Sequence, residues 1–135
     1  MYLTKIEARQ SEINGKGVFA LEDISKGTKV WVFEPTHDKS ISKKEYAALS
    51  ADAQEVLAHV AYLSPTSGKY IFPPEGDPAR YTNHSLENNL TVVIDSAISP
   101  EPYFVANRDI AVGVEITNNY LEFDEVTKAH KPDWV

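Results

Sequence analysis

The ten residues Arg80–Asn89, RYTNHSLENN, gather side chains that can hydrogen-bond, titrate or bind a metal ion. Asn83 can donate and accept through its amide, and His84 can serve as a base, a metal ligand or a stacking surface. Apolar stretches flank the segment on both sides. It is therefore either an ordinary turn between two strands or a loop that holds a ligand, and these residues alone leave both interpretations open.

Metal binding and hydrolysis are disfavoured at this segment. None of the other histidines, His37, His59 and His130, stands at a recognisable metal-ligand spacing from His84, so we expect no metal site. Ser85 adjoins His84, but neighbours in an extended chain point to opposite sides. The chain also has no nucleophile-elbow pattern, which argues against Ser-His-acid hydrolysis.

Two further segments carry polar groups at the ends of predicted strands. NGKGVFA at 14–20 places two glycines around Lys16, where they either form a β-turn or let the backbone approach a ligand closely. No helix follows, so this is not a dinucleotide-binding fingerprint. GVEITNNYLEFDE at 113–125 ends a predicted strand with amides and Tyr120. That tyrosine is either a satisfied core residue or a positioned hydroxyl in a site.

The elements that must position these groups are mostly strands. Runs of Val, Ile, Thr and aromatic residues, separated by Gly, Pro and Asn, predict strands at 3–8, 17–20, 28–33, 69–72, 90–95 and 103–108. Residues 43–62 differ, because Ser42 and Glu45 have the spacing of a capping box and apolar residues then recur at helical intervals. The sequence therefore predicts a mostly β, α+β single domain with one or two short helices as an insert.

The composition is that of an ordinary globular domain. The chain has 135 residues, of which 42% are hydrophobic and 24% charged. No apolar run approaches the ~18 residues of a membrane-spanning helix, and the first residues do not resemble a secretory signal. The absence of cysteine excludes disulfides, thiolate nucleophiles and cysteine-based zinc sites. We expect a cytoplasmic location and no membrane partner.

The charge predicts the kind of partner. A net charge of -7 argues against direct nucleic acid binding and favours neutral or basic partners. Residues 95–125 hold seven acids against the single base Arg108. The acids are Asp95, Glu101, Asp109, Glu115, Glu122, Asp124 and Glu125. They form either a solvated acidic face or a groove for a cationic substrate.

Taken in order, three segments resemble the SET domain of protein lysine methyltransferases. GKGVFALEDISKGTKV resembles the opening Gly-x-Gly segment and the following D-I-x-x-G turn of that family. GDPARYTNHSLENN resembles the motif R-F-x-N-H-S-C-x-P-N, and ANRDIAVGVEITNNY resembles the closing A-x-R-D-I-x-x-G-E-E-L-T-x-x-Y. The resemblance covers roughly residues 4 to 125, with 43–62 as a variable insert.

The resemblance implies a SET-domain-like β-clip fold of several short sheets, in which two segments thread past one another in a pseudoknot. We expect residues 1–125 to form a single SET domain and residues 126–135 a C-terminal tail. The family's cysteine-rich flanking modules are absent, so the tail from residue 121 would cover the adenine of the cofactor, with Phe123 or Trp134 as the covering side chain.

The implied cofactor is S-adenosylmethionine. By the resemblance, Asn83 contacts its methionine amino end, and the backbone around His84 lies near the adenine. Lys16 and Gly17 offer backbone groups to the methionine end, and Arg80 assists with its carboxylate.

The implied catalytic residues are Tyr120 and Tyr70. Tyr120 stands at the position of the family's catalytic tyrosine and would orient the methyl and the amine. Tyr70 matches the tyrosine that lines the lysine channel, although it can equally be an edge-strand aromatic. Asn118 occupies the channel position that helps set how many methyl groups fit. Its small size predicts di- or trimethylation.

The sequence departs from the family motif at several positions. Leu86 and Asn88 replace its cysteine and proline, Asn89 falls on its closing asparagine, and Val114 replaces the first of two acids, leaving Glu115.

The leading hypothesis is a protein-lysine N-methyltransferase that acts on a Lys-rich protein substrate. The alternative is a catalytically inactive SET-like module that binds a peptide or protein partner. The presence of both Tyr120 and Asn83 favours the enzyme. A small β-rich adaptor with accidental motifs is a third hypothesis, and the sequence leaves the oligomeric state open.

Overall fold

The structure is a computed structural model that describes residues 1–133. Its strands are β1 (Ile6–Gln10), β2 (Lys16–Ala20), β3 (Lys29–Trp31), β4 (Lys39–Ile41), β5 (Tyr62–Leu63), β6 (Tyr70–Phe72), β7 (Asn83–His84), β8 (Leu90–Val93), β9 (Tyr103–Ala106) and β10 (Glu115–Asn118). Its helices are α1 (Lys43–Ala47), α2 (Ala51–Val60) and α3 (Glu125–His130), with the 3₁₀ turns η1 (Pro78–Tyr81) and η2 (Tyr120–Glu122).

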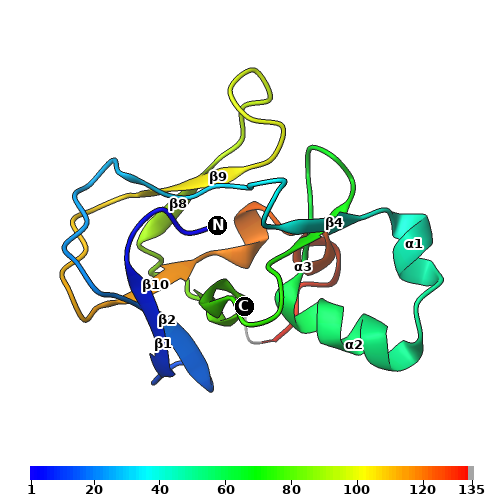
Figure 1. The fold of residues 1–135 in the computed structure, drawn as a ribbon, viewed down its shortest axis with the longest axis horizontal. Helices are drawn as coiled ribbons and strands as arrows, with labels where there is room; N and C mark the ends of the chain where they lie inside the picture. Colours follow the sequence, from blue (N-terminus) through cyan, green and yellow to red (C-terminus); the bar gives the residue numbers. More distant parts are fainter. Residues whose placement is uncertain (134–135) are drawn as a thin grey trace.

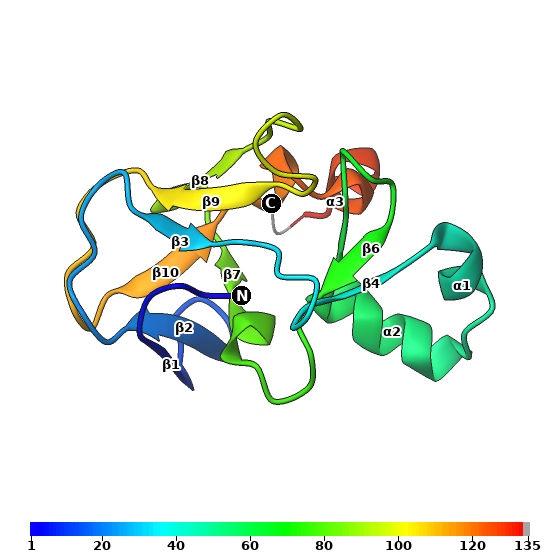
Figure 2. The same ribbon diagram turned by 45° about the horizontal axis from the view of Figure 1, so that its top comes forward.

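The strands form three small sheets around one core (Figure 1). Their orders are β1-β2-β10-β7, β3-β9-β8 and β4-β6-β5. Strand β10 pairs antiparallel with β2 and parallel with β7, so it lies between the segments that carry the first two motifs (Figure 2). The pairing with β7 places Thr117 opposite Asn83 and Asn118 opposite His84.

The strands predicted from composition are confirmed, with boundaries shifted by a few residues. Two of the predicted turns are confirmed as well, because Gly27 and Gly113 adopt φ values of 88° and 87° that favour glycine. Strands β4, β5 and β7 were not predicted. They are two or three residues long and exist through pairing with distant segments, for which local composition gives little signal.

The helical insert forms as predicted and lies at one end of the molecule, away from β1 and β2 (Figure 1). The hydroxyl of Ser42 accepts from the Glu45 amide at 3.0 Å, and the Glu45 carboxylate accepts from the Ser42 amide at 3.1 Å. This reciprocal box starts α1. Ser50 caps α2 in turn by accepting from the Ala53 amide, which explains the break between the two helices.

The core lies where the sheets meet. Its buried apolar side chains come from the strands of all three sheets, from the turns after β2 and β9, and from the segment after η2. The most central are Val18, Leu90, Phe104, Ile116 and Phe123. Within residues 1–133, no helix is both long enough and apolar enough to cross a membrane.

The chain after β10 turns back onto the insert side of the molecule. Asp124 caps α3 by accepting from the Val126 amide, and it also accepts from the Leu63 amide of β5 at 2.9 Å. Thr127 of α3 is buried and donates to Asp124 at 2.6 Å. The tail is therefore attached to the body, at least through α3, whereas Trp134 lies outside the described residues.

Candidate functional site

The polar residues of the three motif segments meet in one place, which we name the Asn83 cluster (Ser11, Lys16, Gly17, Asn83 and Glu115). The buried Asn83 amide lies 2.9 Å from Glu115 Oε2, 3.1 Å from the Lys16 carbonyl and 3.2 Å from Ser11 Oγ. Ser11 Oγ donates to Glu115 Oε1 at 2.7 Å. The Asn83 side chain therefore joins β7 to β2 and β10 and is satisfied by the protein itself.

Gly17 belongs to this cluster because a side chain would not fit there. A Cβ on Gly17 would lie 2.3 Å from Glu115 Oε2 and 3.1 Å from Asn83 Nδ2. The glycine is thus required by the close approach of β2 to the Asn83–Glu115 pair. The turn before it is open, with nothing within 4 Å of a Cβ placed on Gly15.

Asn89, the closing residue of the second motif, fixes β10 from the other side. Its Nδ2 donates to the Glu115 carbonyl at 2.8 Å, and its Oδ1 accepts from the Thr117 amide at 2.9 Å. Asn89 is buried, so both halves of its amide are satisfied by strand backbone. The asparagine therefore holds β10 in place beside the Asn83 cluster.

Tyr120 directly follows β10 and is held at both ends. Its amide donates to His84 Nδ1 at 3.1 Å, and its hydroxyl donates to the Thr82 carbonyl at 2.5 Å. Burial, with a smaller contribution from the carboxylate of Asp124, raises the pKa of Tyr120 to about 12. The hydroxyl is therefore protonated at neutral pH and acts as a hydrogen-bond donor rather than as a base.

His84 contributes its ring to the same corner. The ring centroid lies 5.2 Å from that of Tyr120 in a tilted arrangement, and burial lowers the pKa of His84. The neutral imidazole is favoured, consistent with Nδ1 accepting from the Tyr120 amide.

Beside Tyr120 lies a cavity of about 120 Å³, which we name the Tyr120 cavity. Aromatic side chains supply much of its wall, and α2 and α3 contribute residues on the insert side. The aromatic side chains in the wall include Tyr2, Trp31, Tyr62, Phe104 and Phe123. Such a lining desolvates whatever enters and disfavours a charged group inside.

Asn118 is one of the polar residues in this wall, which also include His59, Arg80, Thr82, Asp124 and Thr127. It lines the cavity and is buried, and its Oδ1 has no hydrogen-bond partner among residues 1–133. A buried acceptor without a donor costs free energy, which a bound N–H or O–H would recover. The predicted placement of Asn118 beside Tyr120 agrees with this geometry.

Two cationic side chains lie at η1. Arg80 belongs to this turn, and Lys16 lies over its Tyr81 ring. Arg80 lines the Tyr120 cavity, and its Nε donates to the carbonyls of Pro73 and Pro74 at 3.0 and 3.2 Å. Lys16 is exposed, with Nζ 5.3 Å from the centre of the Tyr81 ring. Neither cation forms a salt bridge within the described residues, so both remain available to an anionic group.

Tyr70 lies apart from the other predicted site residues. Its ring stacks on Tyr46 of α1 at a centroid distance of 4.2 Å, and it is not among the described residues that line the Tyr120 cavity. Both of the other residues of its strand, Ile71 and Phe72, do line the cavity. The assignment of Tyr70 to a lysine channel stays a prediction.

Sequence reasoning missed Tyr2 and Tyr62, which form part of the cavity wall. Tyr62 lies in β5 beside β6, and its ring packs edge-on against Trp31 and Phe123. Tyr2 hydrogen-bonds through its hydroxyl to Thr82 Oγ1 at 2.7 Å. These residues lie far apart in the sequence and outside any motif. Tyr2 lies outside the predicted strands, and Tyr62 ends the predicted helical insert, so local composition gave no signal for either residue.

Phe123, one of the two side chains proposed to cover an adenine, is a core residue with 4% of its surface exposed. Its ring packs edge-on against Phe104 at 4.8 Å and against Tyr62 at 5.4 Å. Its main contacts are therefore internal, while one edge lines the Tyr120 cavity.

The comparison with protein families matches residues 15–121 to the SET domain. The chain belongs to the SET domain family. The match runs from the glycine segment to the residue after Tyr120, so it includes the whole Asn83 cluster except Ser11. A search of the curated proteins finds no match for this SET domain.

Several solved structures share the fold of this SET domain. The Plasmodium falciparum histone methyltransferase candidate PFL0690c is 22% identical with a TM-score of 0.58, over 87% of this chain and 93% of that chain. An apo form of ctPRC2 mutated in Ezh2 is 26% identical with a TM-score of 0.69, over 94% of this chain. A humanized mutant of the Chaetomium thermophilum Polycomb Repressive Complex 2 bound to the inhibitor GSK126 is 24% identical with a TM-score of 0.63, over 93% of this chain. This SET domain spans only 16% of the matched chain in each Polycomb structure.

Proposed function

We propose that this SET domain transfers a methyl group from S-adenosylmethionine to the ε-amine of a lysine in a protein substrate. The observation that carries the proposal is the position of Tyr120. Its protonated hydroxyl is fixed on the Thr82 carbonyl, at the wall of an aromatic cavity and next to the Asn83–His84 strand. A site of this kind can hold an uncharged amine in a fixed orientation.

The residues around the cavity fit the cofactor that SET methyltransferases use. When bound, S-adenosylmethionine supplies an activated methyl on a sulfonium. Arg80 and Lys16 would hold its carboxylate, because both are cationic, form no salt bridge in the described part of the chain and lie at η1, which leads into β7. Asn83 would act mainly by positioning the loop, since its side-chain amide already donates within the protein. The backbone at Gly17 and His84 would complete the site.

The chemical difficulty is that only a neutral lysine amine is nucleophilic. Deprotonating a lysine of ordinary pKa near pH 7.4 costs about 4 kcal/mol. The aromatic wall formed by Tyr2, Tyr62 and Phe104 lowers that cost, because burial disfavours the ammonium. Tyr120 would then orient the amine, and orientation can contribute roughly 7 kcal/mol or more in favourable cases. The site therefore does not depend on a strong base.

The substrate that this charge distribution favours is a Lys-rich protein or tail. The net charge of -7 attracts cationic partners over a long range. The seven acids of residues 95–125 do not all contribute, since Glu101 is buried against the Tyr62 hydroxyl and Glu115 is bonded within the Asn83 cluster. Histone methyltransferases among the similar structures are compatible with such a substrate. We further propose a SET unit of residues 1–125 with a tail of 126–135, and a cytoplasmic location.

Calorimetric titration with S-adenosylmethionine tests the cofactor assignment. We expect saturable one-site binding that Arg80→Gln weakens by about tenfold or more, because a hydrogen bond to a charged group contributes about 1.5–3 kcal/mol. Lys5→Gln is the matched control, since it removes an exposed positive charge whose side chain makes no hydrogen bond or ion pair within residues 1–133. Equal affinity of wild type and Arg80→Gln would remove Arg80 from the site. A wild type that binds no cofactor, even with a Lys-rich peptide present, would favour the peptide-binding module instead.

A further inference from the structure

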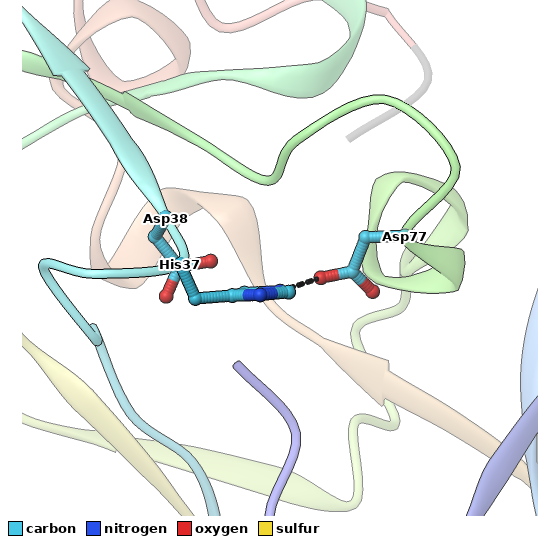
Figure 3. Close-up of side chains that lie close together, drawn as sticks. All are labelled: His37, Asp38 and Asp77. Carbon is cyan, nitrogen blue, oxygen red and sulfur yellow. Dashed lines mark hydrogen bonds and ion pairs between the residues drawn. The ribbon is translucent and has the colours of Figure 1, made fainter.

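Three side chains that can bind a metal ion meet outside the Tyr120 cavity. His37 and Asp38 lie just before β4, and Asp77 caps η1 (Figure 3). One ligand atom from each lies within 4.8 Å of the other two. His37 Nε2 points at Asp77 Oδ2 across 2.7 Å. The group therefore combines one imidazole and two carboxylates from segments 40 residues apart.

Asp38 is the unusual member of this group. Its side chain is fully buried, and its Oδ2 accepts from the Met1 ammonium at 2.8 Å and from the Glu34 amide at 2.9 Å. Its Oδ1 has no hydrogen-bond partner among residues 1–133. A buried carboxylate oxygen is costly unless a donor or a cation satisfies it. The second carboxylate, on Asp77, adds negative charge to the same place.

An open depression of about 580 Å³ gives access to two of the three residues, His37 and Asp77. His37 and Asp77 form part of its wall, together with Met1, Thr4 and Glu75. Thr4 Oγ1 is a second buried polar atom without a hydrogen-bond partner in the described part of the chain. Thr4 thus lines the same depression as His37 and Asp77, whereas Asp38 is buried and is not among the residues of its wall. This arrangement suits a hydrated ion better than an apolar ligand.

We propose that His37, Asp38 and Asp77 bind a divalent transition-metal ion, with Zn²⁺ as the best fit. Imidazole and carboxylate are ordinary zinc ligands, whereas Mg²⁺ and Ca²⁺ prefer oxygen alone. Three protein ligands leave a fourth position for water on the side of the depression. Because Zn–N and Zn–O bonds are roughly 2.0–2.2 Å, the ligand atoms must move closer together than 4.8 Å when the ion binds.

The position of the site gives the ion a structural consequence. Asp77 begins η1, and η1 leads through Thr82 into β7 with Asn83 and His84. A metal ion would tie this segment to the start of β4 and hold the loop that enters the methyl-transfer site. The spacing of histidines in the sequence did not reveal this metal site, because the site has only one histidine and its Asp77 ligand comes from a distant turn.

Titration of chelator-treated, untagged protein with ZnCl₂ tests the proposal. We expect one ion per chain, with the affinity lowered at least tenfold in His37→Gln and in Asp77→Asn. Asparagine can still accept from the Ala79 amide, so Asp77→Asn keeps the cap of η1 while removing the anionic ligand. His130→Gln is the control, because it removes an exposed imidazole that does not belong to the group and should leave the zinc affinity unchanged.

A second readout separates binding from misfolding. At a Zn²⁺ concentration of about 100 Kd, the unfolding midpoint of the wild type should rise by roughly 5 °C or more, and that of His37→Gln should not. Circular dichroism verifies that both variants are folded. Equal zinc affinity in wild type and His37→Gln, absence of one-site binding, or equally tight binding of Mg²⁺ would each overturn the proposal.

Discussion

The Asn83 cluster and the Tyr120 cavity lie on either side of the β7–β10 pair, and they are built in opposite ways. In the cluster, polar groups of Asn83, Ser11 and Glu115 satisfy one another within the protein. In the cavity, aromatic walls surround a space in which the buried acceptor of Asn118 has no partner in residues 1–133. The difference indicates that the two regions have different roles. The polar motif residues mainly position the strands, and the aromatic wall is where the lysine of the proposed substrate would enter.

The largest expected effect comes from the cavity wall. Phe123→Ala should lower the free energy of unfolding by about 3–5 kcal/mol, because it removes a buried ring packed against Phe104 and Tyr62. Urea denaturation measures this loss. Val126→Ala, three residues along and 38% exposed, should change stability far less. A loss below 1 kcal/mol for Phe123→Ala would show that the wall is not part of the core.

The second effect tests the packing of the cluster. Gly17→Ala should cost about 1–3 kcal/mol, because its methyl would lie 2.3 Å from Glu115 Oε2. A double-mutant cycle with Glu115→Ala sharpens the test, since removing that carboxylate leaves room for the methyl. If Gly17→Ala costs the same in both backgrounds, the close approach to Glu115 is not the reason for the glycine.

The smallest expected effect is a pH dependence of the free energy of unfolding, caused by His84, which accepts a hydrogen bond from the Tyr120 amide. Burial lowers the pKa of His84, so the folded state binds a proton less readily than the unfolded state. The contribution to stability is therefore complete above the unfolded pKa of about 6.5 and is progressively lost as the pH falls from there toward the folded pKa. Urea midpoints between pH 7.5 and 5 measure it. His84→Gln should flatten part of this dependence and His130→Gln should not, whereas identical profiles for wild type and His84→Gln would contradict the assignment.

The sequence predicted the cluster much better than the cavity, and the reason is physical. Gly17, Asn83 and Glu115 belong to segments with recognisable spacing, and the caps at Ser42 and Ser50 act within a few residues. The caps could be deduced from local chemistry, whereas the contacts of Asn83 and Gly17 with Glu115 were not predicted. The resemblance to the SET domain then predicted that these segments lie together in the fold.

The cavity could not be deduced in this way, because tertiary pairing decides which aromatic residues face it. Tyr62 and Tyr70 lie in the neighbouring short strands β5 and β6, yet Tyr62 lines the cavity and Tyr70 stacks on α1. The two-residue strand β5 exists only through its pairing with β6. The group of His37 and Asp77 was missed for the same reason, since a turn 40 residues away supplies its second side chain.

Mass spectrometry of a Lys-rich peptide incubated with the protein and S-adenosylmethionine tests methyl transfer at Tyr120 directly. We predict that the wild type adds methyl groups to lysine and that Tyr120→Phe reduces the rate at least 100-fold while remaining folded, because phenylalanine keeps the ring and loses only the hydroxyl bond to Thr82. The number of methyl groups in the product also tests the prediction of di- or trimethylation made from Asn118. Transfer by Tyr120→Phe at the wild-type rate, or no transfer by a wild type that binds the cofactor, would contradict the account.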